Sequence, residues 1–265
     1  MGRRLHARRR TAYNSGVTHR LRVVASPWRA RDDGDEVRFC STCAFSQACL
    51  SEGMDKRELR DLHVLVEHVG PLAPGAHIFR EGQIFDAIAA VREGTVKTWR
   101  VDRDGREQVL GFHLPGEIIG LSAIDGERFP CNADALDAVQ LCRFSFPKIA
   151  MLATRLPGLQ QELFRLLSRD IGHAERLAAD QPADARLASF LLDFSERLGG
   201  PGNTVERIRL VMPRMDIANY LRLAPETVSR LFRRFQDDSL IRVRGRDLEV
   251  CDRPGLEALV AATRD

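Results

Sequence analysis

Met215-Asp-Ile-Ala-Asn-Tyr-Leu-Arg-Leu-Ala-Pro-Glu-Thr-Val-Ser-Arg-Leu-Phe-Arg-Arg-Phe235 is the stretch that most sharply restricts the fold of this chain. Its apolar residues recur with a helical period on both sides of a short break, which predicts a helix, a tight turn and a second helix. Pro225 suits the first position of the second helix, because proline has no N–H to donate and its φ is already helical. The sides expected to be buried are Ile217, Ala218 and Leu221 in the first helix and Val228, Leu231 and Phe235 in the second.

The opposite side of the second helix carries polar and basic groups. Such groups near the start of an exposed helix are what a recognition helix presents to base edges, where arginine suits guanine and glutamate accepts from the cytosine amino group. Residues 241–250 then predict a β-hairpin wing with arginines for phosphates. The alternative is a solvated charged helix, but helix, turn, helix and wing in sequence favour DNA binding. The residues concerned are Glu226, Thr227, Ser229, Arg230, Arg233 and Arg234 on the helix, with Arg242, Arg244 and Arg246 on the wing.

A second pattern lies far upstream, where Cys40, Cys43 and Cys49 have the spacing C-x2-C-x5-C. Three thiolates from one short loop can converge on a soft metal centre such as zinc, copper(I) or an iron–sulfur cluster. Zinc and cubane clusters usually take four ligands, so the fourth has to come from elsewhere. The remaining cysteines, Cys131, Cys142 and Cys251, are the candidates. Buried structural thiols or a disulfide are the alternatives, but the spacing favours a metal or a cluster.

The composition is that of a globular protein. Its 265 residues, 44% hydrophobic and 29% charged, suit one large or two modest domains. No apolar run approaches the ~20 residues that span a bilayer, and the N-terminus has no apolar signal segment. We therefore expect a cytoplasmic protein with reduced thiols and no membrane partner.

Residues 1–36 form a basic arm with no acidic residue before Asp32. We interpret this arm as disordered, because it is poor in core-forming residues. It could add non-specific affinity for phosphates. A transit peptide or a wrongly chosen upstream start codon are the other interpretations.

The middle of the chain changes pattern twice. Residues 55–69 have a helical period in which Leu59, Leu62, Leu65 and Val66 share a face, and Pro71 ends it. From there to residue 145, glycine turns recur about every ten residues between short apolar runs, which predicts a small antiparallel barrel or roll.

A long helix is expected over residues 157–180. Its apolar stripe suits pairing with a second copy of the helix, and the alternative is a helix lying on the barrel. Gln181-Pro182 marks a domain boundary, and residues 185–198 predict a further helix. The stripe consists of Leu159, Leu163, Leu166, Leu167, Ile171, Ala174, Leu177 and Ala178.

With these motifs in place, the chain resembles the CRP/FNR superfamily of bacterial regulators, specifically the FNR (fumarate and nitrate reductase regulator) branch, over residues 38–260. The resemblance is carried by the cysteine loop, Gly111-Phe-His-Leu-Pro-Gly-Glu-Ile-Ile-Gly120, Asp216-Ile-Ala-Asn-Tyr-Leu221 and Glu226-Thr-Val-Ser-Arg230. It implies an α+β fold with an N-terminal antiparallel β-roll, a long dimerisation helix and a C-terminal winged helix-turn-helix. The domains expected are the arm at 1–36, the cluster loop and roll at 37–156, the dimerisation helix at 157–181 and the DNA-binding domain at 182–265.

The resemblance also implies a function, namely an oxygen-responsive transcription regulator of anaerobic metabolism and not an enzyme. In the family, three N-terminal cysteines and one distant cysteine hold a [4Fe–4S] cluster, and oxygen degrades the cluster and weakens the dimer. The distant cysteine precedes an aromatic-containing strand before the dimer helix, which Leu141-Cys142-Arg-Phe-Ser-Phe146 matches. Cys142 is thus the implied fourth ligand, beside Cys40, Cys43 and Cys49.

The implied partners are double-stranded DNA, a second copy of the chain and RNA polymerase. Glu226, Ser229 and Arg230 match the base-reading residues of the family, and the implied target is a palindrome of TTGAT-like half-sites. The turn at residues 102–105 is either a contact for RNA polymerase or a plain hairpin tip.

Two positions depart from the expected pattern. Ala224 stands where Ser or Thr would cap the recognition helix better. The cyclic-nucleotide branch holds its phosphate with an Arg-Ser or Arg-Thr pair, but this chain has Pro130-Cys131, so a cyclic nucleotide is disfavoured. The alternative function is a zinc-stabilised or small-molecule-sensing regulator of the same fold without an iron–sulfur cluster.

Overall fold

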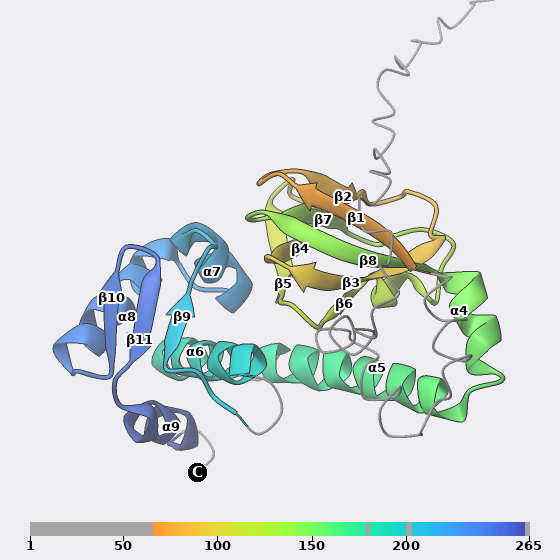
Figure 1. Cartoon of the computed structure of the whole chain (residues 1–265). Helices are drawn as coiled ribbons and strands as arrows, with labels where there is room; N and C mark the ends of the chain where they lie inside the picture. The colour runs from red at the N-terminus through yellow and green to blue at the C-terminus, as the bar shows by residue number, and fades with distance from the viewer. Residues whose placement is uncertain (1–65, 179–180, 200–202, 263–265) are drawn as a thin grey trace, which may run out of the picture.

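The computed structural model describes residues 66–178, 181–199 and 203–262 (Figure 1). The basic arm and three of the four predicted cluster ligands, Cys40, Cys43 and Cys49, lie outside the described residues. A β-roll and a C-terminal helical unit are joined by α5 (Pro157–Ala178), which runs beneath the roll (Figure 1). The long helix predicted from the apolar stripe is therefore confirmed.

The described part of the roll consists of two four-stranded antiparallel sheets. Glycine explains the tight turns between its strands, because Gly75, Gly82, Gly94, Gly105 and Gly116 all have a positive φ that other residues rarely adopt. The antiparallel roll predicted from these turns is confirmed. In spatial order the first sheet is β1 (Val66–Leu72), β8 (Val139–Ser145), β3 (Ala87–Glu93) and β6 (Ile118–Ile119). The second sheet is β2 (His77–Phe79), β7 (Asn132–Ala135), β4 (Val96–Val101) and β5 (Glu107–His113), and the 3-10 helix η1 (Leu121–Ala123) follows β6.

The helix predicted over residues 55–69 is wrong at its C-terminal end. Residues from Val66 onward form β1, which pairs antiparallel with β8, so that Val66 lies opposite Phe144 and His68 opposite Cys142. Pairing with a strand more than seventy residues away decides the conformation, because a short apolar run fits either period. Residues 55–65 lie outside the described part of the chain.

Two apolar clusters lie on the two sides of the first sheet. Inside the roll, Val91, Val96 and Leu141 pack between the sheets. On the outer face, Ile88 and Phe144 pack with residues of α4 (Phe146–Ala153) and of α5. The first sheet therefore separates the interior of the roll from the helix that leads to the C-terminal unit.

The C-terminal unit contains the predicted helix-turn-helix and wing. A left-handed residue, Arg222 at φ 55°, forms the turn, and Ala224 begins the second helix without a side-chain cap, as expected. The buried faces of its helices form one cluster that also includes Val109, Phe112 and Leu114 of the roll. The helices are α6 (Ala183–Gly199), α7 (Arg214–Leu221), α8 (Pro225–Asp237) and α9 (Arg253–Ala261). The wing sheet has the order β10 (Ile241–Arg244), β11 (Asp247–Val250) and β9 (Arg207–Arg209).

Candidate functional site: a DNA-reading helix and a sulfur ligand

The outer face of α8 presents the three predicted base-reading residues together. Glu226, Ser229 and Arg230 are all exposed, and the i, i+3, i+4 spacing places them on one side of the helix. Arg230 makes no ion pair with any residue that the structure describes. The Ser229 hydroxyl donates to the Pro225 carbonyl at 2.9 Å, so in this rotamer it offers a base only its lone pairs. The exposed face of α8 thus presents one cation, one carboxylate and one hydroxyl oxygen that can accept a hydrogen bond.

The flanking arginines divide into free and engaged groups. Arg234, expected on the polar side of the helix, binds Asp184 of α6 at 2.9 Å and so ties α8 to its own unit. On the wing, Arg242 binds Glu249 at 2.8 Å. Arg244 and Arg246 are exposed beside Gly245, at the tip of the hairpin. Neither Arg244 nor Arg246 pairs with an acidic residue in the described part of the chain, so the tip of the wing offers both cations to phosphates.

Arg214, which the sequence did not single out, joins the two helices of the motif. Its guanidinium lies 3.4 Å from the ring centroid of Phe232 in α8, a cation–π contact. Burial lowers its pKa, and its Nη1 has no hydrogen-bond partner among the described residues. An arginine at the start of a helix looks solvated in sequence, so no local signal predicts this contact.

Cys142 lies on the outer face of the first sheet. It packs against the apolar cluster that contains Ile88 and Phe144 and that continues into α4 and α5. Its thiol is half-buried, and burial raises its pKa. His68 of β1 stands directly opposite, with its Nδ1 3.7 Å from the Cys142 sulfur. A cluster bound at this sulfur would adjoin the sheet face that α5 covers.

The two other candidate cysteines lie elsewhere. Cys131 is 4% exposed in the interior of the roll, where burial raises the pKa of its thiol to about 11. Cys251 is exposed in the C-terminal unit, just after β11. Thiolates are the form that binds metal, and burial in the roll core disfavours the thiolate of Cys131. Of the two cysteines that the structure describes in the roll, Cys142 is the more exposed.

Arg197 of α6 forms a polar junction between the roll and the C-terminal unit. Its Nε and Nη2 each donate to the Glu117 carboxylate at 2.7 Å, and its Nη1 donates to Asp193 at 3.0 Å. It also donates to the Phe112 carbonyl. Burial alone would raise the pKa of Glu117, but the hydrogen bond and charge of Arg197 lower it on balance. The carboxylate of Glu117, which follows Gly116 in the turn before β6, is therefore already engaged by protein groups.

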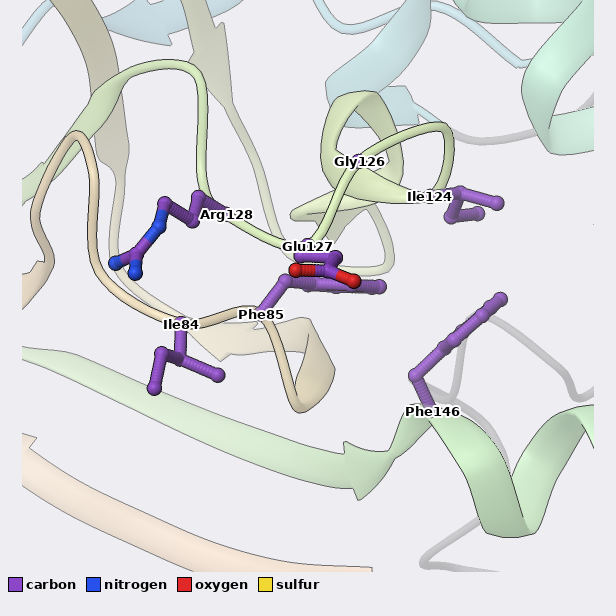
Figure 2. A pocket seen from close by; sticks show the side chains of 7 residues that line it. All are labelled: Ile84, Phe85, Ile124, Gly126, Glu127, Arg128 and Phe146. Carbon is purple, nitrogen blue, oxygen red and sulfur yellow. The ribbon is translucent and has the colours of Figure 1, made fainter.

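A pocket of about 420 Å³ opens on the surface of the roll beside α4 (Figure 2). Among the described residues that line it, Arg128 is the one cation; it donates to the Gly82 carbonyl at 2.6 Å and points away from Phe146 (Figure 2). A phosphate needs a free cation and donor groups, which this wall does not supply. The lining residues are Ile84, Phe85, Ile124, Gly126, Glu127, Arg128 and Phe146.

The face of α5 that turns away from the roll retains large apolar side chains. Leu159 and Leu166 are buried against the roll, whereas Phe164 and Ile171 are each 60% exposed and stand two helical turns apart on one side. Phe164 was not part of the stripe predicted from sequence. The helix therefore packs on the roll and also offers a second apolar surface.

Comparison with known proteins gives consistent matches. Residues 185–259 match the Crp-like helix-turn-helix domain, and residues 70–155 match the cyclic nucleotide-binding domain. The chain is 38% identical to the transcriptional activator protein FnrA of Stutzerimonas stutzeri, over 85% of this chain and 94% of the relative. It is 34% identical to the fumarate and nitrate reduction regulatory protein of Salmonella typhi, over 85% of this chain and 92% of the relative. The structure of FixK2 from Bradyrhizobium japonicum is similar at a TM-score of 0.66 and 25% identity, over 73% of this chain and 96% of that one.

Proposed function

The chain belongs to the CRP/FNR family of transcription regulators, in its FNR branch, and from this premise we propose that it senses oxygen through a [4Fe–4S] cluster and regulates anaerobic metabolism. The helix-turn-helix makes it a DNA-binding regulator, and the relatives are transcription regulators and not enzymes. The observation that carries the cluster proposal is the half-buried thiol of Cys142 on the sheet face that α5 covers. No helix in the described part of the chain is long and apolar enough to cross a membrane. Because the relatives are transcription regulators, we propose a cytoplasmic location.

Four cysteines would hold the cluster, namely Cys40, Cys43, Cys49 and Cys142. When bound, the cluster supplies an oxygen-sensitive inorganic centre. Cys142 anchors the ligand set on β8, next to Phe144, which shares an apolar cluster with Leu159 of α5. Ligation at Cys142 therefore ties the N-terminal loop to the support on which α5 rests. A coupling free energy of about 1–3 kcal/mol between this site and the dimer is enough for a usable switch.

The exposed side of α5 is the proposed dimer surface. Its occupant is a second copy of the same helix, because Phe164 and Ile171 form an apolar line two turns long that a self-complementary partner would cover. Burying one such side chain contributes about 1.5–3 kcal/mol. A two-fold dimer presents two recognition helices to two half-sites about one helical turn apart.

Each recognition helix would read a TTGAT-like half-site of double-stranded DNA. Arg230 donates to the O6/N7 edge of guanine, and Glu226 accepts from the opposing cytosine or from an adenine amino group. Ser229 accepts through its lone pairs, since its proton is used by the Pro225 carbonyl. RNA polymerase is the further partner proposed, with the hairpin tip at residues 102–105 as one exposed surface for it.

Anaerobic reconstitution with iron and sulfide tests the proposal. We expect a brown protein with about four iron atoms per chain that bleaches in air, as thiolate-bound clusters do. A colourless protein containing zinc and no iron would overturn the cluster proposal. That result would leave a zinc-stabilised regulator of the same fold.

A further inference from the structure

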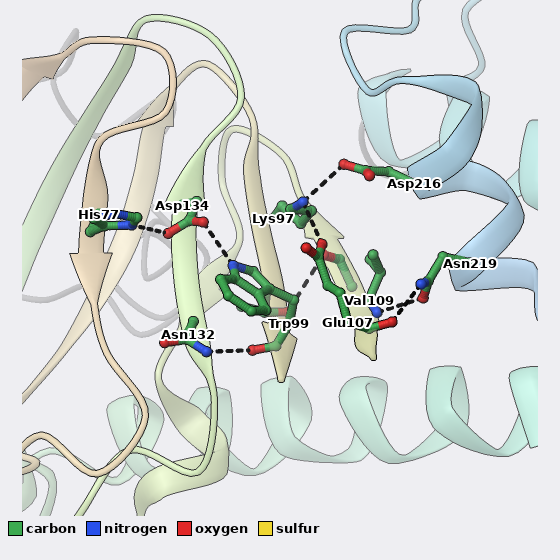
Figure 3. A network of polar contacts seen from close by, with 11 residues as sticks. His77, Lys97, Trp99, Glu107, Val109, Asn132, Asp134, Asp216 and Asn219 are labelled. Atoms are coloured by element: carbon green, nitrogen blue, oxygen red, sulfur yellow. Dashed lines mark hydrogen bonds and ion pairs between the residues drawn. The ribbon is translucent and has the colours of Figure 1, made fainter. Parts of the chain in front are cut away.

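The outer edge of β5 is covered by a side chain of the DNA-binding unit. Within the part of the chain that the structure describes, β5 is the last strand of its sheet, so its outward N–H and C=O groups have no neighbouring strand there. The side chain of Asn219 in α7 takes the place of a neighbouring strand. Its Oδ1 accepts from the Val109 N–H at 2.8 Å, and its Nδ2 donates to the Glu107 carbonyl at 2.6 Å (Figure 3). A single carboxamide thus reproduces the donor and acceptor pattern of a paired strand.

A lysine of the adjacent strand reaches the same helix. Lys97 of β4 lies 2.7 Å from the Glu107 carboxylate and 3.0 Å from Asp216 of α7 (Figure 3). Its side chain is 12% exposed, and that of Asp216 is 18% exposed. Burial lowers the pKa of Lys97, but the two carboxylates raise it on balance, so the lysine stays charged. Asp216 and Asn219 are three residues apart and hence on one face of α7.

Aromatic side chains also pack between β5 and α7. Phe112 of β5 lies 5.2 Å from the ring of Tyr220, which follows Asn219 in α7. The recognition helix α8 begins only four residues after α7 ends, and both helices share one core. Whatever fixes α7 against the roll therefore fixes the direction of α8.

The contact leaves the reading face open. Glu226, Ser229 and Arg230 stay exposed while Asn219 and Asp216 are bound to the roll. The contact between α7 and the roll therefore does not cover the base-reading side chains.

We propose that Lys97, Asp216 and Asn219 form a coupling contact through which the sensor roll orients the recognition helix and passes on the state of the sensor. The three are positioning residues, because they act through α7 on α8 and do not reach the base-reading face. The relay of the sensor state rests on the proposed cluster function, whereas the positioning of α8 requires DNA binding alone.

The test uses the full chain as Asn219→Ala, with and without the reconstituted cluster and always under anaerobic conditions. We expect faster hydrogen exchange at the Val109 amide, about tenfold weaker binding to a TTGAT palindrome at fixed salt, and a smaller ratio between cluster-loaded and cluster-free affinities. Dimerisation, measured by sedimentation, should not change. Met215→Ala is the matched control, since Met215 lies on the same helix and is 69% exposed.

A second pair of variants, which differ in the charge of one side chain, tests the contact even if Asn219→Ala folds poorly. Lys97→Met removes the charge that links Glu107 to Asp216, whereas Lys97→Arg retains it. We expect weakened, less cluster-dependent binding in Lys97→Met and recovery in Lys97→Arg.

The possible outcomes separate this inference from the function on which it builds. If Asn219→Ala exposes the Val109 amide but leaves both affinities unchanged, the contact is purely structural and the inference fails. Tighter DNA binding by the variant would make the contact inhibitory and would also overturn it. If the wild-type protein binds DNA equally well with and without the cluster, both the proposed sensor function and the relay of the sensor state fail. The comparison of wild-type and variant DNA affinities would still decide whether the contact positions α8.

Discussion

Replacing Arg197 with methionine should sharply destabilise the junction between the roll and the DNA-binding unit. The change keeps an unbranched apolar side chain near Phe194 but removes the guanidinium. Glu117 and Asp193 would then face each other without the cation that binds them at 2.7 Å and 3.0 Å. Each of the three side chains is only about one-fifth to one-quarter exposed, so water replaces the lost hydrogen bonds poorly.

The expected magnitude follows from this burial. Removing one partner of a buried ion pair costs about 3–5 kcal/mol, because the other charge stays buried and uncompensated. Partial exposure places Arg197→Met at the lower end, about 3 kcal/mol in the free energy of unfolding. Arg242→Met is the matched control, since Arg242 is 60% exposed and its pair with Glu249 should contribute about 0–1 kcal/mol.

Urea unfolding of both full-length variants, followed by circular dichroism at neutral pH, measures the difference. Equal losses in Arg197→Met and Arg242→Met, or a loss below about 1 kcal/mol at Arg197, would refute the reasoning. Such a result would mean that water solvates the Glu117 carboxylate in the folded protein.

Four further predictions concern stability in acid, ligation of the cluster, recognition of DNA bases and dimerisation. Arg197 lowers the pKa of Glu117 in the folded protein below its ordinary value of 4.5. The stability that this pair contributes is therefore fully present above pH 4.5 and is lost as the pH falls through the lower pKa of the folded protein. A free energy of unfolding that does not fall in this acid range would contradict the prediction. Cys142→Ala should abolish the visible absorption of the reconstituted protein and Cys131→Ala should retain it, and the reverse result would assign the fourth ligand to Cys131. Arg230→Ala should cost about 1–3 kcal/mol at the guanine of the half-site in a binding-site selection assay, whereas a uniform loss over all sequences would make it a phosphate contact. Ile171→Glu should shift the sedimenting species towards monomer, because it places a charge in the apolar line of α5, and an intact dimer would exclude that surface.

The sequence predicted the elements whose signals are local. The helix-turn-helix follows from a helical period on both sides of a break and from Pro225 at a helix start, and both of its helices form where expected. The roll follows from its glycine turns. The few apolar residues around Val66 fit a helical period as well as a strand period, and only pairing with Phe144 decides between the two.

The contacts that join the two units could not be read from the sequence. Asn219 pairs with Val109 across 110 positions, and Arg197 pairs with Glu117 across 80. In sequence, each of these polar residues is indistinguishable from a solvated one. Spacing alone likewise does not separate Cys131, in the interior of the roll, from Cys142, on the outer face of the first sheet, and only the family resemblance favoured Cys142 as the ligand.

Whether the cluster controls DNA binding is measured by titrating the reconstituted dimer with air-saturated buffer while visible absorption and occupancy of a TTGAT palindrome are followed in the same sample. We expect DNA occupancy to fall in step with the bleaching of the cluster, and Cys142→Ala to show neither visible absorption nor occupancy. Occupancy that persists after the absorption has gone would contradict this expectation.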